Sequence, residues 1–77
     1  MNPPQVELAA ALRERLAIIA DETSRRDPDR HLARLRSISE KIAELGKTLP
    51  PPIDPQLAHF LARSSYDKAL AFLEAKL

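Results

Sequence analysis

The prolines of this chain divide it into pieces of helix length. They stand at positions 3, 4, 28, 50, 51, 52 and 55, and a proline is tolerated in the first turn of a helix but not in its interior. The stretches between them are rich in Ala, Leu, Glu and Arg, which favour helix. We therefore expect an all-α fold: a small helical bundle of two long antiparallel helices, a Pro-rich crossing and two short C-terminal helices.

The first long helix is expected over residues 5–23, after an N-terminal tail of residues 1–4. At 100° per residue, four large apolar side chains fall within an arc of about 80° and predict the stripe that faces the core: Leu8, Leu12, Leu16 and Ile19. Ile18 lies about 100° away from this stripe, so we expect it outside the core.

The second long helix is expected over residues 28–45. Asp27 is a typical N-cap residue and Pro28 suits the first helical position. Gly46 follows the helix and is expected to adopt the left-handed conformation that often ends one. Apolar residues repeat at 3-4 spacing along the helix and continue beyond it, which predicts its buried face: Leu35, Ile38, Ile42, Leu45 and Leu49.

Residues 48–54 form the Pro-rich linker. Three consecutive prolines favour an extended polyproline II conformation, and Leu49 and Ile53 are expected to fix its two ends to the core. Asp54 and Pro55 then repeat the Asp-Pro start of the preceding helix.

Two short helices are expected after the linker, over residues 55–63 and 66–77. The apolar faces of these segments would point about 180° apart on one straight helix, so a break at Ser64 and Ser65 lets both reach one core. The alternative is one unbroken helix, which would need a partner on its second apolar face.

Composition excludes several classes of function. The 77 residues form one domain, contain no Cys and carry a net charge of +1. Disulfides and thiolate metal sites are therefore excluded, and neither a signal peptide nor a membrane span is recognisable, so we expect a cytoplasmic protein without a membrane partner. The two His residues lie in no ligand cluster, and no nucleophile, phosphate loop or facing carboxylate pair is evident. We expect no enzyme activity, cofactor, metal or small-molecule substrate.

The only basic segment surrounds the start of the second helix. Arg26, Arg30 and Arg34 are spaced four residues apart, and an Arg row of this kind can bind phosphates. Acidic neighbours, Asp21 and Glu22 among them, offer local partners that would neutralise this row instead. A regulatory nucleic-acid-binding module is thus the alternative interpretation.

Three apolar residues lie away from the main stripe of their own helix: Ile18, Leu32 and Phe72. Small domains often gain stability by oligomerising, and two-fold dimers are the commonest assembly. We therefore expect a small non-catalytic helical interaction or scaffold protein, most simply a homodimer, with these three residues as interface candidates and the Arg row as a patch for a polar partner.

Overall fold

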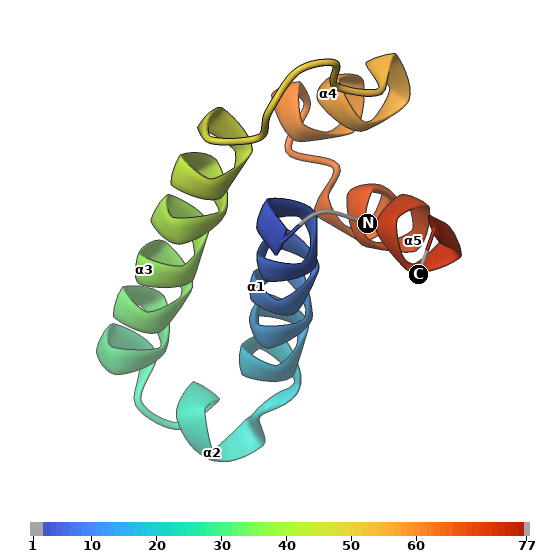
Figure 1. Cartoon of the computed structure of the whole chain (residues 1–77). Coiled ribbons are helices and arrows are strands. Elements are labelled where there is room, and N and C mark those ends of the chain that lie inside the picture. Colours follow the sequence, from blue (N-terminus) through green and yellow to red (C-terminus); the bar gives the residue numbers. More distant parts are fainter. Residues whose placement is uncertain (1–2, 77) are drawn as a thin grey trace.

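The computed structural model describes residues 3–76 of the chain, and this part contains five helices (Figure 1). Their bounds are α1 (Pro3–Ala20), α2 (Glu22–Arg25), α3 (Pro28–Lys47), α4 (Pro55–Ala62) and α5 (Tyr66–Lys76). Within these residues there is no strand, so the expected all-α fold is confirmed.

Helices α1 and α3 form the long hairpin of the fold. They pack along each other and run in opposite directions, and the short helix α2 closes one end of the hairpin (Figure 1). Asp27 caps α3 as predicted, because its Oδ1 accepts the backbone N–H of Arg30 at 3.3 Å and Pro28 occupies the first turn.

The beginning and end of α1 differ from the prediction. The helix already includes Pro3 and Pro4, because proline lacks an N–H and the N–H groups of a first helical turn have no partner within the helix. Residues 1 and 2, the rest of the expected tail, lie outside the described residues. The helix also ends at Ala20 rather than at residue 23, because Asp21 has an extended backbone and caps α2 through the N–H of Ser24.

The prediction for Gly46 is wrong. Gly46 has no positive φ and lies inside α3, which continues to Lys47. The helix ends one residue later, where the backbone N–H of Thr48 donates to the carbonyls of Glu44 and Leu45, both at 3.2 Å.

The linker carries the chain from the end of α3 to α4. Leu49 is buried as expected, but the side chain of Ile53 is 38% exposed and does not fix the second end. Residues 51 and 52 form a bend rather than the expected extended segment, and the Pro51–Pro52 bond is cis. Asp54 then caps α4, accepting the backbone N–H of Gln56 at 2.8 Å.

The predicted break between the last two helices is confirmed, and its geometry is that of a Schellman motif. Ser64 has a φ of 54°, its N–H donates to the carbonyl of Leu61 at 3.1 Å, and the N–H of Ser65 donates to that of Phe60 at 2.8 Å. Within residues 3–76 the left-handed residue is therefore Ser64 and not Gly46, and it lets α4 and α5 share one core.

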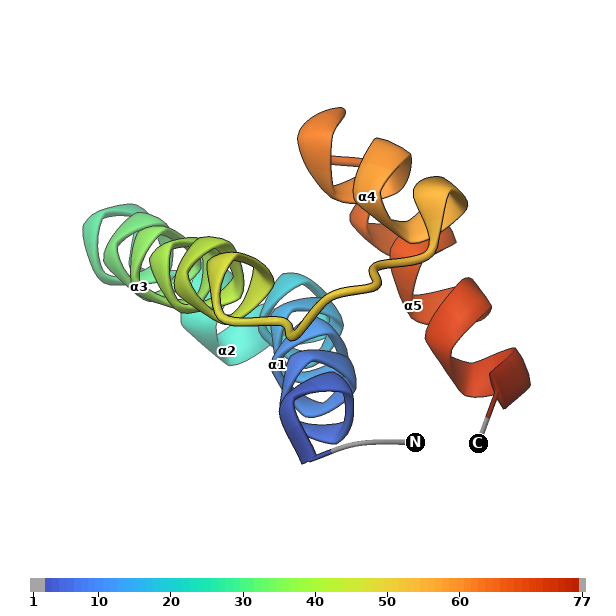
Figure 2. The ribbon, with the colours of Figure 1, turned by 45° about the horizontal axis from the view of Figure 1, so that its top comes forward.

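Helix α5 packs against α1, and α4 packs against α5. Figure 2 shows α1 lying between α3 and α5. The buried apolar residues come from all four longer helices and the linker: Leu8, Ala9, Ala11, Leu12, Ile18, Ile38, Ile42, Leu49, Leu57, Ala69, Leu70 and Leu73. The predicted faces of α3, α4 and α5 all contribute to this core.

The register predicted for α1 holds for its first half only. Ile18 is 5% exposed and belongs to the core, whereas Leu16 and Ile19, expected inside, are 39% and 37% exposed. The reason is the length of α5. Its first residue, Tyr66, lies beside Arg15, and its last turn shares a cavity with Gln5. Helix α5 therefore covers α1 only as far as Arg15, and beyond it α1 is buried only where it meets α3.

Candidate interaction surface

The end of α1 carries an exposed apolar surface. Residues 16–20 are all apolar, and five consecutive helical residues at 100° each span more than the whole circumference. One neighbouring helix can therefore bury only part of them, and α3 buries Ile18 alone. We call the remaining four exposed residues the α1 ridge: Leu16, Ala17, Ile19 and Ala20.

An apolar hollow lies between α3 and α4. It has a volume of about 470 Å³ and takes in the end of α3, both ends of the linker and the Ser64 turn. We call it the α3–α4 groove, and its lining residues are Ile42, Ala43, Gly46, Lys47, Leu49, Ile53, Ala58, Leu61, Ala62, Ser64 and Tyr66. Lys47 is the only charged residue among them, so the groove is suited to apolar side chains.

One contact joins the residue that precedes the α1 ridge to a residue that lines the α3–α4 groove. The guanidinium carbon of Arg15 lies 5.0 Å from the ring centroid of Tyr66. Arg15 directly precedes the ridge, and Tyr66 lines the groove. A cation over a phenol ring at this distance is a favourable contact. It holds the start of α5, at one edge of the groove, against α1 just before the ridge.

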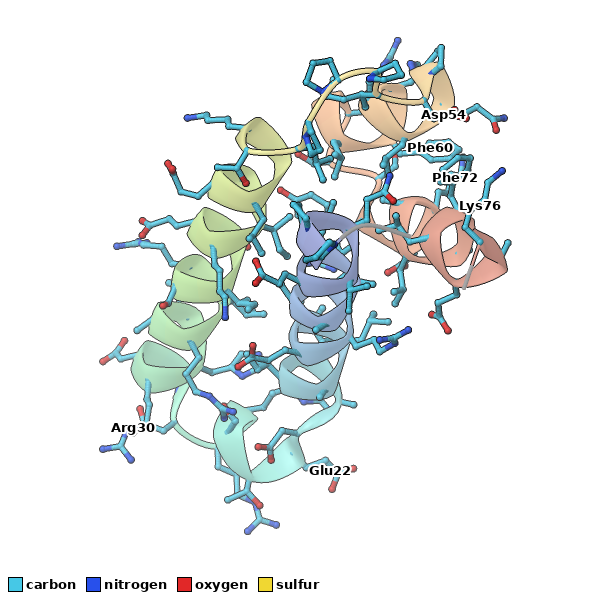
Figure 3. The ribbon with its side chains drawn as sticks, in the orientation of Figure 1. Glu22, Arg30, Asp54, Phe60, Phe72 and Lys76 are labelled. Atoms are coloured by element: carbon cyan, nitrogen blue, oxygen red, sulfur yellow. The ribbon has the colours of Figure 1, made fainter. Side chains whose placement is uncertain are left out.

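The three residues predicted as interface candidates have different environments. Ile18 is buried between α1 and α3 and cannot reach a partner in this fold. Phe72 is half-buried, with its ring in an edge contact with Phe60 at 6.5 Å between centroids and with the Lys76 ammonium 5.3 Å away (Figure 3). Leu32 is 58% exposed and is the accessible one of the three.

The predicted Arg row is interrupted and largely neutralised. Arg26 caps α2 and is not part of α3. Arg34 Nη1 lies 3.3 Å from Asp21 Oδ2, and Arg30 Nε lies 4.0 Å from Asp27 Oδ2. Local pairing was the competing interpretation, and Asp21, one of the acids named for it, pairs with Arg34 of the row. Figure 3 shows Arg30 directed outward at the corner of the hairpin.

The pKa of Asp21, at this corner of the hairpin, is lowered by hydrogen bonds to its carboxylate. The hydrogen bond from the backbone N–H of Ser24 lowers its pKa most, and the hydrogen bond from Arg34 lowers it further. Both favour the charged form of the carboxylate. Asp21 thus links the N-terminus of α2 to α3 as an anion.

The two histidines lie far apart in the sequence and have different roles. His31 Nδ1 lies 3.0 Å from the hydroxyl of Ser24, and this bond ties the buried Ser24 of α2 to the first turns of α3. His59 is exposed on α4 and its ring stands 6.2 Å from that of Phe60. Among residues 3–76, no group of three or more His, Cys, Asp or Glu side chains could hold a metal ion.

Comparison with known proteins does not place this chain in a family. Searches of protein-family models, of curated proteins and of solved structures found no match. None of the described helices combines the length and apolarity that crossing a membrane requires.

The α1 ridge and the α3–α4 groove were not predicted from the sequence. The signal for the ridge was present in the unbroken apolar run of residues 16–20, which no single stripe accommodates. The groove had no comparable signal, because it depends on where the linker places α4 relative to α3.

Proposed function

We propose that this chain is a small non-catalytic helical interaction protein that self-associates through the α1 ridge. The observation that supports this is the exposure of Leu16 and Ile19 within a wholly apolar run. Isolated exposed apolar residues need no explanation, but contiguous ones mark interaction surfaces in soluble proteins. A chain of 77 residues also has a thin core, so covering such a surface adds stability that the monomer lacks.

The alternative, a nucleic-acid-binding module, has less support. Phosphate binding requires Arg side chains that are free to replace counterions, whereas Arg30 and Arg34 each have an acidic partner within 4.0 Å. The interaction protein is therefore the function that the arrangement of side chains favours.

Sedimentation velocity on the full-length chain tests the proposal. We expect the wild type to change from monomer to dimer as its concentration rises through the micromolar range, since new contacts of this kind follow mass action. Ile19→Glu places a charge on the ridge and should keep the chain monomeric. Val6→Glu is the matched control, because Val6 is an exposed apolar residue of the same helix outside the ridge.

Two results would contradict the proposal. One is a wild type that stays monomeric at every concentration. The other is a dimer that Ile19→Glu leaves intact while Val6→Glu dissociates it, which would move the interface to the other end of α1.

A further inference from the structure

We infer that the α3–α4 groove receives the α1 ridge of a second copy of this chain, in a two-fold pair whose hairpins run antiparallel. This inference rests on the proposed self-association and adds the partner surface and its orientation. It brings together two apolar surfaces that the fold leaves uncovered, one convex and one concave.

The two-fold arrangement follows from the position of these features. In an isologous interface, if surface A of one copy contacts surface B of the other, the reverse contact is made at the same time. The ridge and the groove lie on the same chain, toward opposite ends of the hairpin. One rotation can therefore fill both grooves and cover both ridges.

The orientation follows from the two ends of the hairpin. The ridge ends at α2, at one end of the hairpin, and the groove lies at the end where the linker leaves α3 (Figure 1). Two copies must therefore run in opposite directions for each ridge to meet the other copy's groove.

Charge favours the same arrangement. Lys47 is the only charged residue lining the groove, and its ammonium is 3.9 Å from Glu44 in a pair whose side chains are about three-quarters exposed. Glu22 follows the ridge, is exposed, and forms no ion pair within the described residues. Figure 3 shows it projecting from the α2 end of the hairpin. The antiparallel pair brings each Lys47 toward the partner copy's Glu22.

A charge-reversal cycle measured by sedimentation velocity tests this pairing. Glu22→Lys and Lys47→Glu should each raise the dimer dissociation constant about tenfold, since each change affects two exposed ion pairs per dimer. The double variant should return to within about threefold of the wild type. Glu40→Lys on the exposed face of α3 is the control and should leave the constant unchanged, because Glu40 does not line the groove.

Disulfide trapping separates this geometry from a ridge-to-ridge dimer. The chain has no Cys, so single introduced thiols report unambiguously. An equimolar mixture of Ile19→Cys and Ala62→Cys chains should give mainly the mixed disulfide, because Ala62 lines the groove. Homodimers of Ile19→Cys would overturn the inference.

The possible failures are distinguishable. If the charge variants have no effect but Ile19→Glu still dissociates the dimer, the ridge–groove pairing is wrong and self-association stands. If the wild type is monomeric throughout, both proposals fail.

Discussion

Ile18 and Ile19 are neighbours with opposite environments, and replacing them one at a time tests how α1 is packed. Ile18 is 5% exposed and Ile19 is 37% exposed. Truncating a buried Ile to Ala costs about 2–5 kcal/mol because a cavity remains. Truncating Ile19, whose site is open to water, should cost about 1 kcal/mol. We therefore expect Ile18→Ala to lower the free energy of unfolding by about 2 kcal/mol more than Ile19→Ala.

Urea denaturation followed by circular dichroism, at a concentration where the chain is monomeric, measures this difference. If Ile18→Ala does not fold, the milder pair Ile18→Val and Ile19→Val keeps the comparison, with about 0.5–1.5 kcal/mol expected for the first and close to none for the second. An equal or larger loss at Ile19 would refute the reasoning. It would mean that Ile19, and not Ile18, belongs to the buried face of α1, as the apolar spacing predicts.

Three further changes probe the caps and the corner of the hairpin. Ser64→Gly should stabilise the fold by about 0.5–1 kcal/mol in thermal unfolding, because glycine adopts a positive φ without strain; a loss would contradict the Schellman geometry. Asp54→Ala should cost about 1 kcal/mol by the same assay, since the Gln56 N–H loses its acceptor, and an unchanged midpoint would show the cap to be unimportant. The pKa of Asp21 is lowered in the fold, so its contribution is present above the ordinary Asp pKa near 4 and is lost as pH falls through the lower folded value. Urea midpoints of Asp21→Asn should therefore decline less toward acid than those of the wild type, and parallel declines would refute this.

The features that sequence predicted well are those set by a few adjacent residues. Asp27 and Asp54 each cap a helix that begins with proline, and the break at Ser64 lies where it was expected. Such signals are local, because the capping side chain and the N–H that it accepts are two or three residues apart. The face of α3 was also predictable, since polar and charged residues separate its apolar positions and one stripe takes in all of its large apolar residues except Leu32.

The features that sequence predicted poorly depend on distant parts of the chain. In residues 16–20 every position is apolar, so spacing cannot decide which of them is buried. Which of them is buried depends on α5, because the contact between α5 and α1 ends near Arg15 and leaves only α3 to cover residues 16–20.

The surroundings of Gly46 also include a distant element, α4. A Cβ added at Gly46 would lie 3.6 Å from Cδ1 of Leu61 on α4, an ordinary contact distance. The missing side chain therefore keeps part of the groove open. It does not end the helix.

Solvent accessibility of the isoleucine methyl groups tests the account most directly. The chain has five isoleucines, so methyl-labelled protein gives a simple spectrum whose signals a soluble paramagnetic agent attenuates according to exposure. At low concentration we predict strong attenuation for Ile19 and Ile53 and little for Ile18. As concentration rises, Ile19 on the ridge and Ile53 in the groove should become protected together. Attenuation of Ile19 and Ile53 that does not change with concentration, or an Ile18 signal more attenuated than that of Ile19, would contradict the account.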